Sequence, residues 1–516
     1  MNFTVSLPFN HSDEELEKRI FKKLKTKDYR ILKKSIDARK KNDIRIVYRI
    51  SSDIEDPVKN IYLSIEKKRK KIVSRNYFPT IYIIGSGPAG LFCAYWLSLH
   101  GIPVTILEKG PPISQRVVDI ARFFRYGELK EDSNVCCGAG GAGTFSDGKL
   151  YTRIDSPYID FILDIFVRFG ADPSIRYVNN PHLGSNGIRH CIKNFIYNSN
   201  ISVKWNSSLS DITIKNGKIS HIQIDDKKIS CDEVFLATGH SARDVYSLLR
   251  GKNIAMEFKP FAVGLRIEHP REFINQSQYG EDYQNQYPGI DTAYYRLTCS
   301  QKDLSHDVYT FCMCPGGYIL NSSTTEEGIV TNGMSNVQKN GHYSNSAVVG
   351  SISYEDCKQF GYEGMDAGLD FQKHLEKSFK DLVNKKGVHT IPGQRVVDFL
   401  EQKESTKLEN SSCLTPVQPA PLYKHLPSSL YESLVKGILD FDKKIKGFAT
   451  HPDARLYGIE TRTSAPYRIL RDDKTLTSPT LSNLYPIGEG AGWSGGIISS
   501  AVDGINAAEK YIKKFI

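Results

Sequence analysis

The sequence predicts an α/β fold with a Rossmann-like parallel-sheet domain, an inserted mixed α+β domain and a small N-terminal α+β domain. Three observations predict it. A complete strand, turn, helix and strand unit spans residues 80–110, a second strand, glycine-rich turn and helix follow at 484–512, and the pattern between them changes to that of a mixed sheet. We therefore expect three domains, namely 1–75, 78–255 joined with 458–516, and the inserted 256–457.

The first unit opens with a short apolar run at 81–84, which is typical of a strand buried on both faces of a parallel sheet. The turn GSGPAG follows directly. Gly85 permits the tight turn, Gly87 has no Cβ to hold a phosphate away, and Gly90 lets the next helix pack closely.

The helix of this unit begins at Pro88 and Ala89, and its free N–H groups would face the phosphates. A second strand at 104–107 ends in Glu108, 23 residues after Gly85. A carboxylate at that place accepts hydrogen bonds from two ribose hydroxyls and repels a 2′-phosphate. Because strands, helix and acid accompany the glycines, the unit predicts a dinucleotide site.

Composition and cysteine usage narrow the class of protein. The 516 residues are 40% hydrophobic and 24% charged, which is ordinary for a soluble globular chain. No apolar run approaches the roughly 18 residues of a membrane span, and the N-terminus lacks the pattern of a secretory signal. Ten scattered cysteines without CxxC spacing predict neither a metal site nor disulfides, and favour a cytoplasmic setting.

The excess positive charge is confined to the N-terminal domain. Residues 1–75 hold 21 Lys and Arg against 11 Asp and Glu, which accounts for the whole net charge of +10. A strand at 3–7, a helix at 13–25, a Lys/Arg-rich connection and a strand at 44–50 are expected here. The charge could bind nucleic acid or an acidic partner, or form a solvated face. We favour the solvated face, because no nucleic-acid motif accompanies it.

A second glycine-dense segment, SNVCCGAGGAGTFSDGKL at 133–150, follows the first unit. Four of its glycines lie within six positions, at 138–143, and let the backbone pass tightly against a planar or phosphorylated ligand. Helices are expected at 155–170 and 182–198, and a hairpin turns at Asn216-Gly217.

The strand after this hairpin ends in Ala237-Thr238-Gly239, and the inserted domain that follows includes a helix around 372–383. The chain then returns with a strand at 484–487, a glycine-rich turn at 488–496 and a helix at 497–512. A second module of this kind at the far end predicts that both ends of the chain meet on one ligand.

These motifs together carry a specific resemblance. GSGPAG with Glu108, ATG at 237–239 and YPIGEGAGWSGGI resemble the FAD-binding fold of the glutathione-reductase type. With SNVxxGxGGAGTFSDGKL, ATGHSARD, KPFAVGLRIEHP, FCMCPGG, NGMS and GIETRTSAP, the chain resembles uncharacterised FAD-dependent dehydrogenases related to the HI0933-like flavoproteins.

The resemblance implies noncovalently bound FAD. Its binding residues would be Gly85, Gly87, Pro88, Ala89, Gly90, Glu108, Lys109, Arg116, Gly141, Ala142, Gly143, Thr144, Phe145, Ala237, Thr238, Gly239, Gly488, Glu489, Gly495, Gly496 and Ile497. Arg116 would hold the ribose or phosphates, and the C-terminal helix would stabilise negative charge on the reduced flavin.

Candidates for the substrate pocket are His240, Lys259, Arg266, Cys312 and Arg462. Cys312 could pair with Cys314 as a dithiol that exchanges electrons with the flavin, or both could be buried structural cysteines. We favour the structural interpretation, because disulfide reductases of this fold use a CxxxxC spacing that is missing here. No spacing selects a catalytic acid or base.

The function expected from all this is that of an FAD-dependent oxidoreductase acting on a small organic molecule. No second GxGxxG, strand and acid unit is present, so a nicotinamide donor, NADH or NADPH, would bind in the open cleft. Two alternatives remain: an RNA-modifying or RNA-binding flavoprotein that uses the basic N-terminal domain, and a noncatalytic flavin sensor.

Overall fold

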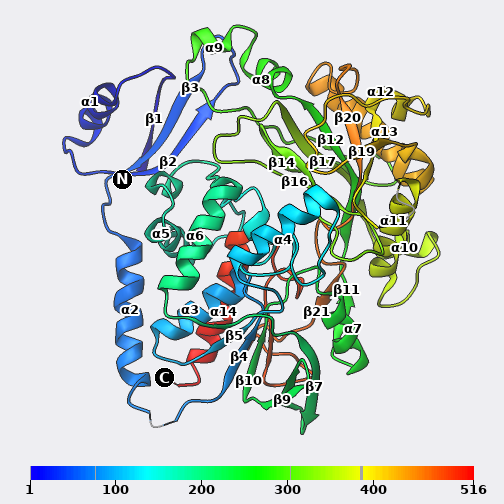
Figure 1. Cartoon of the computed structure of the whole chain (residues 1–516). Coiled ribbons are helices and arrows are strands. Elements are labelled where there is room, and N and C mark those ends of the chain that lie inside the picture. Colours follow the sequence, from blue (N-terminus) through cyan, green and yellow to red (C-terminus); the bar gives the residue numbers. More distant parts are fainter. Residues whose placement is uncertain (1, 76, 303, 384–386, 516) are drawn as a thin grey trace.

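A five-stranded parallel sheet organises the computed structural model, which describes residues 2–75, 77–302, 304–383 and 387–515 (Figure 1). The strand order is β22-β10-β4-β5-β6, and every neighbouring pair is parallel. The bounds are β4 Ile81–Ile84, β5 Thr105–Leu107, β6 Ser202–Lys204, β10 Glu233–Leu236 and β22 Leu484–Pro486. The predicted α/β class is confirmed, and the sheet takes its strands from both ends of the chain.

Both faces of this sheet are covered, which explains its uninterrupted apolar strands. On one face Ile83 and Phe235 join a hydrophobic cluster with helices α3 and α14. On the other face Ile84 and Leu236 pack with an antiparallel meander and helix α7. These elements are α3 Pro88–Leu99, α14 Ile497–Ile512, α7 Arg243–Gly251, β7 Leu209–Lys215, β8 Lys218–Ile224 and β9 Lys227–Ser230.

The first hairpin of the meander turns where the sequence predicts. Asn216 and Gly217 have φ angles of 51° and 68°. Two consecutive positive φ values are what a two-residue turn needs to match the twist of its strands. The prediction from the Asn-Gly pair is confirmed.

Helices α3 and α14 touch at the level of the backbone. A Cβ on Gly504 of α14 would lie 2.1 Å from the carbonyl oxygen of Ala89 in α3. A Cβ on Gly488 would lie 2.8 Å from the Cβ of the same Ala89. This close packing keeps the two helices side by side (Figure 1) and places Gly488 of the C-terminal glycine turn against the start of α3.

The inserted region forms a seven-stranded sheet with order β13-β14-β17-β12-β20-β18-β19. It is antiparallel except for the β18–β19 pair, so it is a mixed sheet. Its strands are β12 Phe261–Pro270, β13 Thr298–Cys299, β14 Val308–Cys314, β17 Tyr343–Ile352, β18 Ile391–Arg395, β19 Val417–Pro419 and β20 Arg455–Glu460.

Helices and two small strand pairs complete this region. The expected helix around 372–383 is the C-terminal part of α11. The bounds are α8 Arg271–Tyr279, α9 Tyr283–Gln286, α10 Tyr354–Gln359, α11 Ala367–Val383, α12 Val396–Leu400, α13 Ser428–Lys444, β11 Met256–Phe258, β15 Tyr318–Asn321, β16 Thr331–Met334 and β21 Tyr467–Ile469.

The N-terminal domain is a three-stranded antiparallel sheet with order β1-β3-β2. The expected Lys/Arg-rich connection is wrong, because its residues form the edge strand β2. An edge strand tolerates lysines, since their ends can reach solvent. Lys34 of β2 exchanges backbone hydrogen bonds with Tyr177 and Asn179. The elements are β1 Asn2–Pro8, α1 Asp13–Leu24, β2 Arg30–Asp37, β3 Arg45–Ser51 and α2 Pro57–Ile72.

Three helices and two 3₁₀ turns lie between β5 and β6. Two of the helices were expected from the sequence, whereas α4 was not. They are α4 Ile113–Tyr126, η1 Ala142–Phe145, α5 Tyr158–Arg168, η2 Pro173–Arg176 and α6 Gly184–Asn198.

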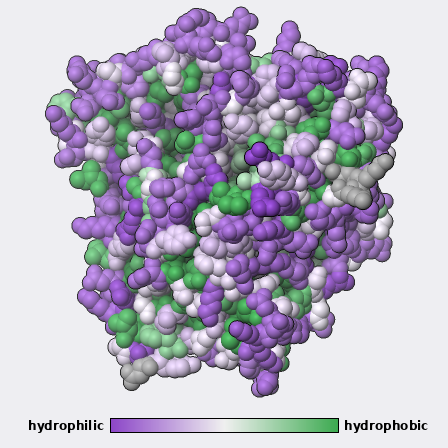
Figure 2. Space-filling model, viewed as in Figure 1, coloured by the Kyte–Doolittle hydropathy of each residue, from purple (hydrophilic) through white to green (hydrophobic). Residues whose placement is uncertain are grey.

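Apolar side chains are scattered in small groups over the face seen in Figure 2, among mostly hydrophilic ones. Within the described part of the chain, every helix falls short of the length and hydropathy needed to cross a bilayer.

Candidate functional site

A single cavity of about 1800 Å³ brings the glycine turns together. It reaches from the carboxyl ends of the parallel strands to the inserted sheet and the N-terminal domain. All the residues predicted to bind the cofactor line it, except Gly90, Arg116 and Thr144. Pockets for one drug-sized ligand have roughly 300–1,000 Å³, so this cavity has room for more than one molecule.

Two helices begin at the cavity wall without a side-chain cap. Gly87 is the N-cap of α3 and Gly496 is the N-cap of α14, and neither position supplies a capping hydrogen bond. The first N–H groups of a helix have no partner within it, and they carry partial positive charge. The cavity therefore has two built-in sites for negative charge, one from each end of the chain.

Two cavity glycines are not required by the packing of the protein itself. Gly87 has an ordinary φ of −68°, and a Cβ there would come no closer than 4.0 Å to Gly141. At Gly495 a Cβ would meet nothing within 4 Å. In both places a side chain would project into the cavity, so the walls fit a ligand that needs close approach to the backbone, such as a dinucleotide diphosphate.

Gly85 is different, because the protein needs it. Its φ is +104°, and a Cβ would lie 2.5 Å from the carbonyl oxygen of Ala237. Packing also requires glycine at position 90, since a Cβ there would lie 2.0 Å from the carbonyl oxygen of Gly85. Gly90 thus lies behind the cavity wall and holds the helix against the turn.

These differences predict two outcomes for substitution by alanine. Gly87→Ala should leave the unfolding free energy of the apo-protein nearly unchanged and weaken FAD binding at least about tenfold, or 1.4 kcal/mol. Gly85→Ala should destabilise the apo-protein by about 3 kcal/mol through strain and overlap. Urea unfolding and fluorescence titration with FAD measure both, and a Gly87→Ala protein with unchanged FAD affinity would contradict the assignment.

Glu108 lines the cavity and also closes the first turn. Its Oε2 accepts hydrogen bonds from the Ser86 amide at 2.8 Å and the Ser86 hydroxyl at 2.6 Å, and its Oε1 accepts from the Gly110 amide at 2.9 Å. A carboxylate has about four acceptor positions, so capacity remains for a ribose hydroxyl. Lys109 beside it forms an ion pair with Asp244 at 2.8 Å.

Arg116 does not contact the cavity, which corrects the prediction that it holds ribose or phosphate. Its side chain is fully buried, and its guanidinium donates to five backbone carbonyls of the glycine-dense segment. Burial lowers the pKa of Arg116 to about 10. The side chain shapes the loop that forms the wall. Thr144 is also behind the wall, where its hydroxyl donates to the Ala139 carbonyl.

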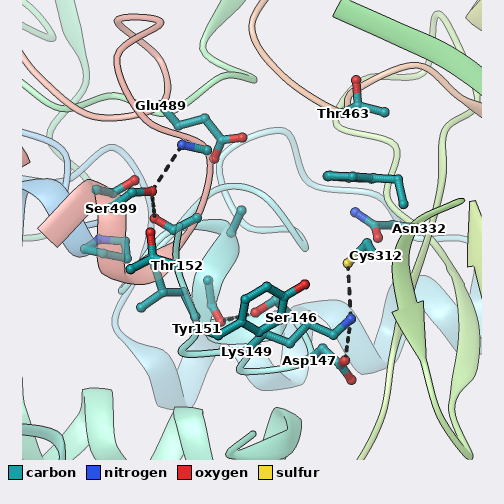
Figure 3. Close-up of a pocket in the computed structure, with 18 of the residues that line it drawn as sticks. Ser146, Asp147, Lys149, Tyr151, Thr152, Cys312, Asn332, Thr463, Glu489 and Ser499 are labelled. Carbon is teal, nitrogen blue, oxygen red and sulfur yellow. Dashed lines mark hydrogen bonds and ion pairs between the residues drawn. The ribbon is translucent and has the colours of Figure 1, made fainter. Parts of the chain in front are cut away.

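Glu489 is the carboxylate that projects into the cavity beside the C-terminal turn (Figure 3). Burial raises the pKa of Glu489 to about 7, although Lys259 opposes the shift. His240 Nδ1 lies 3.9 Å from Glu489 Oε2. Burial, with Arg462 and Arg243 nearby, lowers the pKa of His240 to about 3, so the imidazole is neutral. Glu489 can hold or release a proton near neutral pH.

Three of the substrate-pocket candidates differ from the prediction. Arg266 and Arg462 belong to buried ion pairs, and Arg266 and Lys259 do not line the cavity. Arg266 is fully buried away from the cavity and pairs with Glu460 at 2.8 Å. Arg462 lines the cavity, but its guanidinium pairs with Glu376 at 3.0 Å. Lys259 also lies outside the lining. The charges of Arg266 and Arg462 are neutralised by their carboxylate partners, and the charge of Lys259 lies outside the cavity lining. The prediction that these residues anchor the substrate is therefore corrected.

Cys312 lines the cavity, whereas Cys314 is fully buried. Lys149 lies next to them and was missed as a site residue. The signal in the sequence was the pair Asp147 and Lys149 around Gly148, since two charges in a buried glycine-rich segment need a specific partner. Lys149 Nζ lies 2.7 Å from Asp147 Oδ2. No group of three or more potential metal ligands occurs among the residues that the structure describes.

Three family models match the chain. Residues 260–463 match the FAD-dependent protein, C-terminal domain-like family, residues 83–131 match the NAD(P)-binding Rossmann-like domain, and residues 1–52 match a domain of unknown function. An uncharacterized protein from Clostridium beijerinckii is 39% identical over 543 residues, which cover 99% of this chain and 98% of that protein.

The solved structures that the chain matches are more distant. The structure of CtdE in complex with FAD is 11% identical to this chain. The match covers 84% of this chain and 83% of that chain, with a TM-score of 0.32. The flavin-dependent brominase Bmp2 has 12% identity, 85% and 80% coverage and a TM-score of 0.35. A geranylgeranyl bacteriochlorophyll reductase-like protein from Thermoplasma acidophilum has 12% identity, 85% and 79% coverage and a TM-score of 0.34.

The matched C-terminal domain contributes residues to the same cavity that the two uncapped helix N-termini line. FAD is the cofactor that this combination of domains uses. The chain therefore belongs to the family of FAD-dependent proteins that join a Rossmann-like dinucleotide-binding domain to this C-terminal domain.

Proposed function

We propose that the protein is an FAD-dependent oxidoreductase of the glutathione-reductase type that passes hydride or electrons between a small organic substrate and FAD. The observation that carries the proposal is the shared cavity, in which two uncapped helix N-termini meet a chamber walled by the inserted domain. When bound, FAD supplies the hydride and electron chemistry. The remaining roles belong to residues of this chain.

The start of α3 would hold the diphosphate, because its free N–H groups and dipole favour negative charge. The start of α14 at Gly496 would favour negative charge at the other end of the cavity. Glu489 would accept or release the proton that accompanies hydride transfer, since its pKa is raised to about 7. The inserted domain would limit the access of water to the flavin in this chamber.

The N-terminal domain supports a role on the substrate side. Lys34, Ile36 and Arg39 of this domain line the same cavity, as do Tyr294 and Arg296 of the inserted domain. Arg39 is paired with Asp37, so Lys34 and Arg296 would supply the positive charge that attracts an anionic substrate or a nicotinamide donor. The proposed partners are therefore small molecules, and the position of β2 favours this role over nucleic-acid binding. We propose a cytoplasmic location, because the ten cysteines are free and free thiols are typical of a reducing compartment.

Anaerobic spectroscopy tests the proposal. The purified protein should be yellow and release FAD on denaturation. NADH, NADPH or one member of a metabolite panel should bleach the flavin absorbance, and an added acceptor should restore it through repeated cycles. A folded protein that stays colourless after incubation with FAD would contradict the proposal. A flavin that every donor leaves oxidised would favour the sensor alternative.

Glu489 gives a prediction for pH. Its folded pKa of about 7 lies above its ordinary value of 4.5, so its carboxyl contributes most to stability when protonated. This contribution is lost as pH rises from about 4.5 through 7. Glu489→Gln should therefore match the wild type near pH 4.5 and exceed it by on the order of 3 kcal/mol at pH 8. Urea unfolding of the apo-proteins across this range measures the difference, and a difference independent of pH would contradict the raised pKa.

A further inference from the structure

Strand β14 contains an irregularity at Cys312. Phe311 pairs with Ala347 and Cys314 pairs with Asn345, so three steps along β14 match two along β17. The extra residue makes a β-bulge, and Cys312 has a left-handed φ of +51°. Such a backbone costs on the order of 1–3 kcal/mol for a residue other than glycine.

The bulge redirects the Cys312 side chain. In a regular strand, residues 312 and 314 would share one face, because side chains alternate with a period of two. Here Cys312 lines the cavity while Cys314 is fully buried. A cysteine that only filled the core would need no such backbone, and bulges often redirect a side chain next to an active site.

Lys149 holds its ammonium group against this sulfur (Figure 3). Lys149 Nζ lies 3.6 Å from Cys312 Sγ and donates to the Met313 carbonyl. The ammonium is fixed on its other side by Asp147 at 2.7 Å. Asp147 in turn accepts hydrogen bonds from the Ser335 amide at 2.6 Å and lies 3.1 Å from His182 Nε2. The cation is thus anchored before any ligand binds.

The charges that act on Cys312 come from four segments: the loop after η1, β12, β20 and the turn before α14, whose Glu489 has its pKa raised by burial and by Cys312. Lys149 follows η1, Arg266 of β12 donates to the Cys312 carbonyl at 2.8 Å and to Cys314 Sγ at 3.3 Å, and Asp147 is the opposing charge. Glu460 of β20 is compensated by Arg266. The pKa of Cys312 is lowered well below its usual range by a hydrogen bond from Cys314, and then by Lys149 and Arg266, against burial and Asp147.

The pKa of Cys314 shifts in the opposite direction to that of Cys312. The pKa of the Cys314 thiol is raised well above its usual range, first by burial and then by its hydrogen bond with Cys312. Cys314 therefore stays protonated when Cys312 loses its proton.

We propose that Cys312 is a nucleophilic thiolate on the cavity wall, stabilised by Lys149, that forms a covalent bond with a soft electrophile in the substrate chamber. The sulfur donates an electron pair to the electrophilic carbon or sulfur, and the leaving group departs with the electrons of the bond that breaks. No base is consumed, because the thiol has already lost its proton. The proposal deepens the proposed function and rests on the same cavity, but its test needs no flavin turnover.

Iodoacetamide is the probe, because it forms an S–C bond and releases iodide only when a thiolate attacks. The FAD-saturated wild-type protein is labelled between pH 6 and 8, and mass spectrometry follows each cysteine peptide. Cys312 should react at least about tenfold faster at pH 6 than Cys136, which lines the same cavity and serves as an internal control. Its rate should change less than about twofold up to pH 8.

Two variants examine the role of Lys149. Lys149→Met should lower the labelling rate of Cys312 at pH 6 at least about tenfold and make it rise with pH. Lys149→Arg keeps the charge and should retain most of the rate. If Lys149→Met fails to fold, the wild-type profile decides alone.

Either of two results would overturn the proposal. One is a wild-type Cys312 that stays unlabelled at every pH, and the other is a rate that rises about tenfold per pH unit from 6 to 8, as for an ordinary thiol. Failure of flavin reduction would leave these labelling results unaffected. The two proposals can therefore fail separately.

Discussion

Replacing Arg116 with methionine is expected to destabilise the protein by on the order of 4 kcal/mol and to abolish FAD binding. Each buried carbonyl that loses its only donor costs about 1–3 kcal/mol. The Arg116 guanidinium donates to the carbonyls of Asn134, Val135, Gly138, Ala139 and Gly141 at 2.7 to 3.2 Å. The last three also accept from the Gly141 amide or from Thr144, so the loss falls mainly on the carbonyls of Asn134 and Val135. Without the guanidinium the loop would lose its shape. The cavity wall that faces the cofactor would then be lost as well.

Urea unfolding and FAD titration measure this effect. Arg122→Met on the same helix is the matched control, because Arg122 is exposed and pairs with Glu128 on the surface. Its loss should cost less than about 1 kcal/mol. Arg116→Lys should not restore binding, since one ammonium cannot reproduce the fork of guanidinium donors. An Arg116→Met protein that unfolds and binds FAD like the control would show that the loop keeps its shape unaided.

Replacing Glu376 with glutamine is the second change with a large expected effect, about 3–5 kcal/mol of lost stability. Glu376 lies on α11 of the inserted domain and is almost fully buried. Its carboxylate receives Arg243 of α7 at 2.7 Å and Arg462 at 3.0 Å. The Thr461 hydroxyl also donates to it at 2.7 Å. Glutamine would leave the buried Arg462 guanidinium and the partly buried Arg243 guanidinium without a counterion at the junction of the two domains.

The pH dependence of the wild type follows from the same contact. Burial opposes ionisation of Glu376, but Arg243 and Arg462 outweigh it and hold its pKa well below the ordinary 4.5. A lowered folded pKa gives stability that is present above pH 4.5 and is lost as pH falls below it. Glu376→Gln should remove part of this acid dependence.

Asp381→Asn is the control for Glu376→Gln, because Asp381 lies on the same helix in an exposed pair with Lys377. It should change stability by less than about 1 kcal/mol. Urea unfolding at pH 7 and at pH 4 compares the three proteins. Equal losses in the two variants would show that the buried pair does not clamp the domains.

Local patterns in the sequence were enough to predict the parallel sheet and its glycine turns. The run at 81–84, the turn from Gly85 and the hairpin at Asn216 each depend on neighbours within a few residues. Backbone sterics and side-chain alternation act over that same distance, so the pattern and the structure agree. Strand β2 is the exception, because its lysines resemble a connection until β3 supplies the partner that makes an edge strand.

The roles of the charged residues could not be predicted in this way. Arg116 resembles a phosphate ligand until the loop at 133–141 is seen to fold around it. Arg462 resembles a substrate anchor until Glu376, 86 residues away, is seen to neutralise it. The charge of a side chain gives its chemistry, but its partners decide whether that chemistry is available.

By itself, the sequence determined the α/β class, the two helix N-termini that open at glycine turns, and FAD as the ligand they suit. Only the tertiary structure decided which polar side chains face the cavity and which hold it together. Cys312 and Lys149 are 163 residues apart, and their contact depends on a bulge in one strand and the path of a distant loop. Contacts of that kind arise from the packing of whole domains, and no local periodicity encodes them.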